Sequence, residues 1–398
     1  MLNGPFSSWP SYTREESQAV SKVLLSNRVN FWTGTECREF EKEFAEFVDS
    51  KYAIIVSNGT TALDLAFIAL GIGKGDEVVV TSRTFLASVS SIVNAGATPV
   101  FADVSLDSQN ITSASILNIM SDKTKAIVCV HLAGWPCDMD PIMKLAEKHD
   151  LFVIEDCAQA HGAKYNGRSV GSIGHIGAWS FCQDKIMTTG GEGGMVTTNN
   201  RELWSRMWSY KDHGKSWEAV YETEHPPGFR WLHDSFGTNW RMTEMQAAIG
   251  RLQLEKMPEW NAKRRANAQA IWDTAIELPG IRVPESRCSS CPGNCDESSG
   301  CVHAAYKCYV FVEAGEEARN TLIEKINARG VPCFQGSCSE VYLEKAFDGT
   351  GFRPSSRLPN AQRLGETSLM FLCHPTLTEQ EIQLTCDALR DSVLELEL

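Results

Sequence analysis

The stretches Ile154-Glu-Asp-Cys-Ala-Gln-Ala-His-Gly162 and Ser180-Phe-Cys-Gln-Asp-Lys-Ile-Met-Thr-Thr-Gly-Gly-Glu-Gly-Gly194 decide the fold of this chain. Apolar runs at residues 151–154 and 177–181 predict a buried strand just before each charged side chain, Asp156 and Lys185. Parallel strands of an open α/β sheet end at one edge, where such sheets bind their ligands. We therefore expect both side chains at the same edge of one sheet.

A carboxylate and an amine at one sheet edge are the groups that pyridoxal phosphate needs. A lysine forms the imine with its aldehyde, and an acidic partner keeps its pyridine nitrogen protonated. Taken alone, Asp156 is more often a turn residue and Lys185 a solvated side chain. Found together in these strings, they predict an enzyme that uses this cofactor.

Seven apolar runs, rich in Val, Ile and Phe and bounded by turn residues, predict the strands of the sheet. They lie at 53–57, 77–82, 99–104, 126–132, 151–156, 177–181 and 194–198. Apolar residues at helical spacing separate the earlier runs, at 60–70, 87–94, 113–120 and 139–149. This alternation predicts a mainly parallel α/β sheet with helices on both faces.

We assign residues 1–256 to this large domain and residues 257–398 to a smaller C-terminal α+β domain. In the first, the Trp-rich segment 203–242 is expected to be a long interface loop. It leads into a helix at 243–256, which Pro258 should stop, and a second helix follows at 261–276. The small domain is predicted to contain a strand at 306–312 and helices at 318–329 and 378–396.

Composition excludes several classes of protein. The 398 residues include 37 basic and 50 acidic side chains, a formal charge of -13, whereas nucleic-acid and anionic-membrane binders need basic surface.

Residues 1–13 lack the basic and apolar parts of a signal peptide, and no apolar run approaches bilayer length, so we expect a cytoplasmic protein. Many of the 14 cysteines, such as Cys129 and Cys182, lie in apolar runs, which favours reduced thiols.

A candidate phosphate site lies in Ser57-Asn-Gly-Thr-Thr-Ala62, which joins a predicted strand to a predicted helix. The free amides at a helix start attract anions, Gly59 permits close approach, and Thr60 and Thr61 offer hydroxyls. A plain helix cap with a glycine turn is the alternative.

These strings, with Val130-His-Leu-Ala-Gly134 and Phe236-Gly-Thr-Asn-Trp-Arg-Met-Thr-Glu-Met-Gln-Ala-Ala-Ile-Gly250, resemble the DegT/DnrJ/EryC1/StrS family of sugar aminotransferases. The likeness extends from near Thr33 to about Ala266, and more weakly beyond. It implies the aspartate-aminotransferase fold (fold type I) and a homodimer with active sites at the subunit interface. It also implies nucleotide-linked keto-sugars as substrates and glutamate as amino donor.

The resemblance assigns roles by position. Lys185 is similar to the imine-forming lysine that also shuttles the proton, Asp156 to the partner of the pyridine nitrogen, and Gln159 to a residue beside the ring. Phe85 takes the place of the aromatic stacked on the ring. The expected phosphate ligands are Gly59, Thr60 and Ser180 of one subunit and Asn239 of the other. Arg241 is a candidate for the donor carboxylate, and His131, His161 and His213 are candidates for contact with the substrate.

Each of these assignments has a structural alternative. Phe85 could be a core residue, Asn239 could cap the helix near Thr243, and Arg241 could pair with Glu244. Neutral structural histidines are also common. Many family members have Thr or Asn before the lysine, whereas this chain has Asp184. We expect its negative charge to adjust the properties of the imine without deciding whether the imine forms.

Four cysteines, Cys288, Cys291, Cys295 and Cys301, lie close together in a polar segment ahead of Tyr306. The first two have the gap common in zinc and iron-sulfur sites, but the whole spacing matches no standard pattern. We therefore expect no metal and an ordinary flexible loop, with a structural zinc as the alternative.

We expect a pyridoxal phosphate-dependent aminotransferase that moves an amino group from glutamate to a nucleotide-linked keto-sugar. By the habit of the family this is a 4-keto-6-deoxyhexose, and the product serves polysaccharide, glycan or antibiotic synthesis. Relatives with histidine in place of the lysine are dehydratases, so Lys185 favours amino transfer. A sugar dehydratase and a non-catalytic cofactor-binding protein remain as alternatives.

Overall fold

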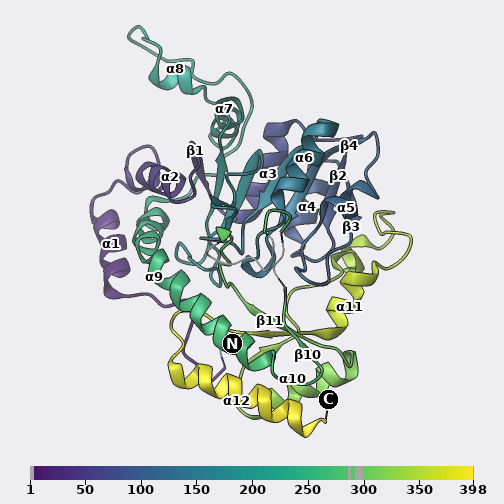
Figure 1. Cartoon of the computed structure of the whole chain (residues 1–398). Helices are drawn as coiled ribbons and strands as arrows, with labels where there is room; N and C mark the ends of the chain where they lie inside the picture. The colour runs from purple at the N-terminus through teal and green to yellow at the C-terminus, as the bar shows by residue number, and fades with distance from the viewer. Residues whose placement is uncertain (1–3, 286–287, 292–298, 398) are drawn as a thin grey trace.

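A seven-stranded sheet forms the centre of the large lobe (Figure 1). The computed structural model describes residues 4–285, 288–291 and 299–397. The strands are β1 (Tyr52–Val56), β2 (Glu77–Thr81), β3 (Thr98–Ala102), β4 (Thr124–Val130), β5 (Phe152–Asp156), β8 (Ile176–Ser180) and β9 (Gly194–Thr198). Each falls on one of the seven predicted runs, so the α/β prediction is confirmed.

The strands are arranged in the order β1-β9-β8-β5-β4-β2-β3. Neighbours from β8 through β3 are parallel, whereas β9 is antiparallel to both β1 and β8. The carboxyl ends of β5 and β8 therefore lie side by side, with Asp156 opposite Ala178. This pairing brings the two deciding stretches of sequence to one edge.

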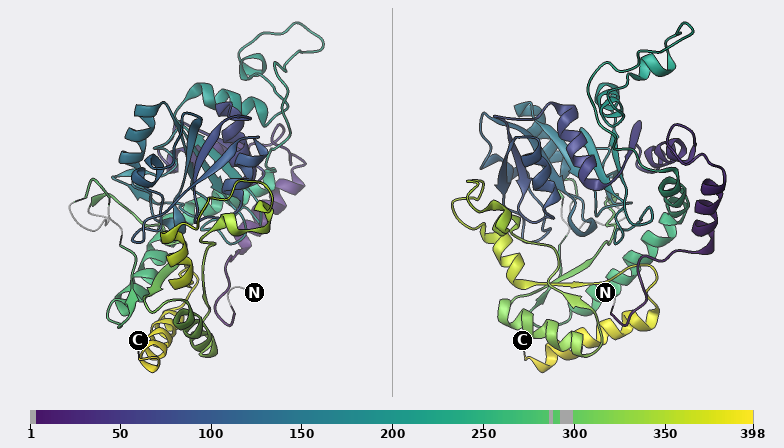
Figure 2. Two further views of the ribbon diagram at one scale, coloured as in Figure 1. Left: turned by 90° about the vertical axis from the view of Figure 1, so that its right-hand side faces the viewer. Right: turned by 180° about the vertical axis from the view of Figure 1, so that it is seen from behind.

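Helices cover both faces of the sheet (Figure 2). Alternate strand residues point to opposite faces, and Val78 and Val80 pack in one apolar cluster while Val79 packs in another. The first cluster holds α3 (Gly59–Leu70), α4 (Ala87–Asn94) and α7 (Arg201–Tyr210). The opposite face is covered by α5 (Ser113–Leu117), α6 (Met139–His149), α2 (Glu36–Phe47) and the first half of α9.

Helix α9 (Glu244–Ala275) is a single helix of 32 residues with Pro258 inside it. The predicted break before Pro258 is therefore wrong. A proline costs a helix one backbone hydrogen bond, but packing holds this helix on both sides of the proline. Its first half packs on α1 (Arg14–Leu25) and α2, and it also packs on α12 (Glu379–Glu395).

The smaller lobe contains a four-stranded sheet in the order β10-β11-β13-β12. Its strands are β10 (Ile281–Arg282), β11 (Cys308–Val312), β13 (Ser368–Phe371) and β12 (Cys333–Phe334), accompanied by α10 (Glu316–Ala328), α11 (Pro359–Thr367) and α12. The described residues also contain shorter elements: the hairpin β6 (Lys164–Tyr165) and β7 (Arg168–Ser169), and the 3-10 turns η1 (Leu132–Gly134), η3 (Val341–Leu343) and η4 (Lys345–Phe347). The division at residue 256 stays a prediction, because α9 continues across it.

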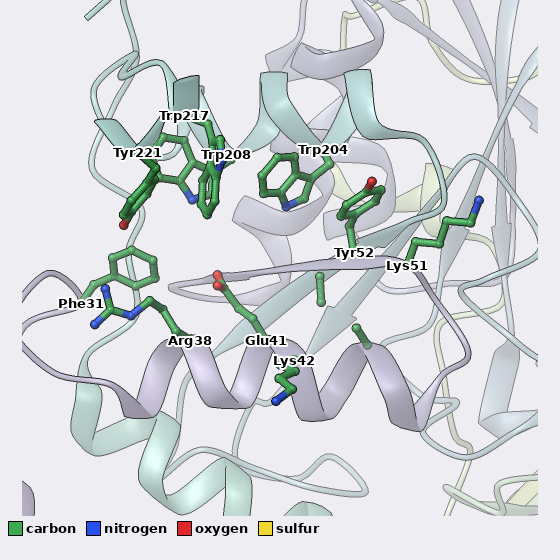
Figure 3. Close-up of a pocket in the computed structure, with 12 residues that line it drawn as sticks. Phe31, Arg38, Glu41, Lys42, Lys51, Tyr52, Trp204, Trp208, Trp217 and Tyr221 are labelled. Atoms are coloured by element: carbon green, nitrogen blue, oxygen red, sulfur yellow. The ribbon is translucent and has the colours of Figure 1, made fainter. Parts of the chain in front are cut away.

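The segment expected to be a loop from residue 203 begins inside α7 and contains α8 (Trp217–Tyr221), so that part of the prediction is wrong. Residues 211–242, here called the arm, include α8 and project away from the sheet (Figures 1 and 2). At the base of the arm, Trp204, Trp208, Trp217 and Tyr221 face α2 across a pocket (Figure 3). This pocket lies beside Tyr52, at the amino end of β1, so it is distinct from the edge that holds Asp156.

None of the helices in the described residues is both long enough and apolar enough to cross a membrane.

Candidate active site

Asp156 ends β5 with its carboxylate buried at the carboxyl edge of the sheet. The Ser88 hydroxyl of α4 donates to Oδ2 at 2.7 Å, and the Ala158 amide donates to Oδ1 at 3.1 Å. A carboxylate fixed by two donors keeps one orientation. It is suited to holding a protonated ring nitrogen in a set position.

Lys185 lies in the turn that follows β8, with its amide donating to the Cys182 carbonyl at 3.1 Å. The indole of Trp9, from the start of the chain, donates to the Lys185 carbonyl at 2.9 Å. The lysine nitrogen lies 5.1 Å from the centre of the Tyr306 ring, which comes from the C-terminal part of the chain. Its own turn and two distant segments of the chain therefore fix this lysine.

Asp184 directs its carboxylate to Tyr306, whose hydroxyl donates to Oδ2 at 2.5 Å. Burial by itself would raise the pKa of Asp184, but the charge of Lys185 and the Tyr306 hydrogen bond outweigh it and lower that pKa. The pKa of Tyr306 is raised by burial and by the Asp184 charge. Asp184 therefore stays negatively charged beside Lys185. This agrees with the prediction that Asp184 adds negative charge next to the imine-forming lysine.

The start of α3 forms an anion cradle against Ser180. Asn58 caps the helix by accepting from the Thr61 amide at 2.9 Å, and the first amides, of Gly59 and Thr60, lack intrahelical acceptors. A Cβ built on Gly59 would lie only 2.6 Å from the Ser180 Cβ. Only glycine allows the helix start to approach Ser180 this closely, and the donors present suit a phosphate.

Phe85 and Gln159 flank Asp156. Phe85 lies one turn before Ser88, and its ring is 72% exposed, so the core alternative for this residue does not hold. Gln159 is buried, and its side-chain oxygen accepts from the Ala133 amide at 2.7 Å. An exposed aromatic ring and a fixed side-chain amide, both from segments next to Asp156, suit a flat aromatic cofactor.

His131 and His161 lie in the core, each fully buried. Nε2 of His131 lies 2.9 Å from the Glu155 carboxylate, and its Nδ1 accepts from the Cys137 amide at 3.0 Å. His161 packs against the rings of Trp179 and Phe181, and burial lowers its pKa to about 3. Such burial leaves no atom for a substrate to contact, so we do not retain either histidine in the substrate site.

Three predicted residues lie in the arm. Asn239 and His213 are exposed, and the cap of α9 is Thr243, so Asn239 does not cap that helix. Arg241 pairs with the buried Asp212 at 2.5 Å. The alternative pairing with Glu244 is not formed, because that carboxylate accepts from the Glu36 and Cys37 amides at the start of α2.

The structure adds three residues to the site that sequence reasoning missed: Ser88, Trp9 and Tyr306. Ser88 follows Phe85 by one turn, and helical spacing from that residue could have indicated it. Trp9 and Tyr306 reach Lys185 from segments more than a hundred residues away, and no local pattern marks them.

Among the four clustered cysteines, the structure brings Cys288, Cys291 and Cys301 together, with all three sulfurs within 4.8 Å of one another. Cys295 lies outside the described residues. The group lies in a segment that crosses from β10 to the large lobe, away from Asp156.

The sequence model of the DegT/DnrJ/EryC1/StrS aminotransferase family matches residues 10–390. The chain belongs to this family. As an aminotransferase of the family it depends on pyridoxal phosphate, and the cradle and carboxylate just described fit that cofactor.

Among curated relatives, the chain is similar to GDP-perosamine synthase of Escherichia coli O157:H7, at 35% identity over 96% of each chain. It is also similar to dTDP-3-amino-3,4,6-trideoxy-alpha-D-glucose transaminase of Streptomyces venezuelae, at 32% identity over 95% of this chain and 92% of that one. Among solved structures, an aminotransferase from Psychrobacter cryohalolentis superposes with a TM-score of 0.94 and 64% identity, over 99% of this chain and 100% of that one. The fold is that of the type I aminotransferases.

Proposed function

We propose that this aminotransferase moves the amino group of L-glutamate to a keto-sugar linked to a nucleoside diphosphate, with a 4-keto-6-deoxyhexose as the expected sugar. The observation that carries the proposal is a fixed Asp156 at the end of β5 and a fixed Lys185 in the turn after the neighbouring strand β8. The names of full-length relatives, among them a GDP-perosamine synthase and a dTDP-sugar transaminase, support a nucleotide-sugar substrate. Such an amino sugar would serve polysaccharide, glycan or antibiotic synthesis.

Pyridoxal phosphate, when bound, supplies an aldehyde that joins the amino group and a ring that accepts the electron pair released at the neighbouring carbon. In our proposal the Lys185 nitrogen would hold the cofactor between turnovers, and during turnover it would carry a proton between the substrate carbon and the cofactor carbon, in one direction with the donor and in the reverse direction with the sugar. Asp156 would hold the ring nitrogen protonated, Gln159 would orient the ring, and Phe85 would cover its face.

The phosphate is proposed to bind at the start of α3. Amides of Gly59 and Thr60, the Thr60 hydroxyl and the Ser180 hydroxyl would donate to it. Asn239 of a second subunit would complete the set. Because the cradle offers neutral donors and a helix start, it binds the anion without a buried cation.

Arg241 remains our candidate for the carboxylate of glutamate. Asp212 contacts its Nη1, and a guanidinium has five N–H donors, so one carboxylate does not exhaust it. His213, exposed two residues from Lys211, stays a candidate for the sugar nucleotide.

Formation of 2-oxoglutarate tests the proposed reaction. With L-glutamate and a panel of nucleotide-linked 4-keto-6-deoxyhexoses, we expect one 2-oxoglutarate for each amino sugar formed, and ping-pong kinetics. The same panel without glutamate is the control. Loss of hydroxyl from the sugar without 2-oxoglutarate would indicate a dehydratase, and no turnover with any keto-sugar would favour a non-catalytic protein.

A homodimer with shared sites is the second part of the proposal. Phe229, Trp231 and Phe236 of the arm are 79%, 84% and 99% exposed, and single subunits rarely leave such apolar groups in water. Asn239 lies three residues beyond Phe236. A second copy that covers these rings would receive Asn239 at its own cradle.

Subunit mixing tests the shared site. Lys185→Ala and Asn239→Ala proteins, each strongly impaired alone, should recover about a quarter of wild-type activity when refolded together. Half of the randomly paired dimers are mixed, and each mixed dimer has one complete site. Mixing Asn239→Ala with the Lys185→Ala/Asn239→Ala double variant is the matched control and should recover nothing, because Lys185 is present but neither subunit supplies Asn239. Failure of the first mixture to gain activity would contradict the crossing of Asn239.

A further inference from the structure

Three cysteine sulfurs converge beside α6, at a site with no part in amino transfer. Cys288 Sγ lies 3.1 Å from Cys291 Sγ and 3.9 Å from Cys301 Sγ, and the Cys291 and Cys301 sulfurs are 4.0 Å apart. Two of these residues are partly exposed and the third is buried. The sulfurs border an apolar cluster in which Cys129 and Cys137 also lie close together, but among the described residues only this group brings three sulfurs together.

The separations suit a tetrahedral metal. Zinc–sulfur bonds of about 2.3 Å place two tetrahedral ligands roughly 3.8 Å apart, close to two of the three distances. A disulfide needs sulfurs about 2.0 Å apart, and one disulfide would join only two of the three sulfurs in this group. The two-residue gap between Cys288 and Cys291 is also typical of one half of a zinc site.

Hydrogen bonds from the large lobe hold the segment that bears the cysteines. The amide and hydroxyl of Ser289 both donate to the Asp138 carboxylate, at 3.1 and 3.0 Å, and the Ser290 hydroxyl donates to Asp140 at 3.0 Å. The Asn166 amide donates to Cys301 Sγ at 3.4 Å. A backbone donor aimed at a sulfur stabilises a metal thiolate and fixes its direction.

We propose that Cys288, Cys291 and Cys301 bind one zinc ion as thiolates. Each thiol loses its proton on binding, and three sulfurs leave one tetrahedral position for a fourth donor. Zinc fits better than an iron-sulfur cluster, because one zinc ion can bind all three converging sulfurs, whereas each iron of a cluster takes at most two cysteine sulfurs.

The proposed ion is structural, and it would also help to hold the segment that leads to Tyr306. The segment from β10 to β11 docks on the large lobe through the Val302 amide to Lys164 and the Ala304 amide to Gly134, at 2.8 and 3.0 Å. It then delivers Tyr306 to Asp184 and Lys185. Zinc would therefore add one more fixed point to the segment that leads to Tyr306, beside its hydrogen bonds to the large lobe.

Metal content of the full-length holoenzyme tests the site directly. Protein purified without chelator should contain about one zinc per chain by plasma mass spectrometry. Cys288→Ser and Cys301→Ser proteins should contain at least about tenfold less, whereas Cys338→Ser, which changes an exposed cysteine elsewhere, should keep the metal. Cobalt substituted into the wild-type protein should give the near-ultraviolet sulfur-to-metal absorption, and this readout needs no folded variant.

Three results would overturn the proposal. The first is wild-type protein that lacks zinc and gains none when zinc is added. The second is zinc that persists undiminished in both cysteine variants. The third is iron, or a Cys288–Cys291 disulfide in protein kept under reducing conditions, in place of zinc.

Discussion

The Lys185→Ala enzyme should turn over at least about 10⁴-fold more slowly than the wild type, because one nitrogen both binds the cofactor and moves the proton. Borohydride reduction of the wild-type holoenzyme should add the mass of the cofactor less one oxygen atom to the peptide that contains Lys185, because water leaves as the imine forms and reduction adds two hydrogens. The same treatment should leave the Ala variant unmodified. Steady-state rates with glutamate and the accepted keto-sugar, together with peptide mass spectrometry, measure both effects.

Lys185→Arg is the matched control for charge. A guanidinium keeps the positive charge beside Asp184 but stays protonated at any working pH, so it can neither attack an aldehyde nor accept a proton. Both variants should therefore be inactive, although Arg should preserve the environment of Asp184 and Tyr306. Activity within about tenfold of the wild type in either variant would remove Lys185 from its proposed role.

Replacement of Asp156 by Asn should lower kcat by about 10²–10³-fold, a loss typical of removing one electrostatic stabiliser from an active site. Asn matches the shape of Asp and can still accept from the Ser88 hydroxyl or the Ala158 amide. What it loses is the charge that keeps the ring nitrogen protonated. The cofactor should still become attached to Lys185, so the defect should appear in the rate and not in the reduced peptide.

Ser88→Ala is the companion to this variant. It leaves the Asp156 charge in place and removes only one of the two donors that orient the carboxylate, so a smaller loss, about tenfold, is expected. The order wild type, Ser88→Ala, Asp156→Asn in kcat is the result that supports the assignment. An Asn variant as fast as the wild type would show that the charge at this position is dispensable.

Much of the large lobe follows from the sequence because each of its strands is a short apolar run between turn residues. The strand order could not be predicted in this way, since β1 pairs with β9 through contacts 140 residues apart, and no local pattern records the antiparallel direction of β9. Helices α1 and α2 were missed although Thr13 and Glu16 form a capping box. Their polar composition hides the apolar stripe that packs on α9.

The active-site residues fall into two similar groups, those that a local sequence pattern indicates and those that only the tertiary fold brings into the site. Lys185, Asp156 and Gly59 belong to local strand-to-turn patterns, so residue types at fixed spacing indicate them. Tyr306 and Trp9 are defined only by tertiary folding, and the burial of His131 depends on Glu155 from a neighbouring strand. The cysteine group illustrates the same limit, because its spacing matched no standard pattern while the fold brings three sulfurs together.

The uninterrupted helix α9 also has a mechanical consequence. At 1.5 Å per residue, its 32 residues make a rod about 48 Å long whose two ends pack in different lobes. A straight helix of this length couples the two lobes. If the C-terminal lobe tilts, helices α1 and α2, which pack on the first half of α9, must move with it unless α9 bends. Helices bend most readily where a backbone hydrogen bond is missing, which makes Pro258 the hinge at which the enzyme could flex without unfolding a turn.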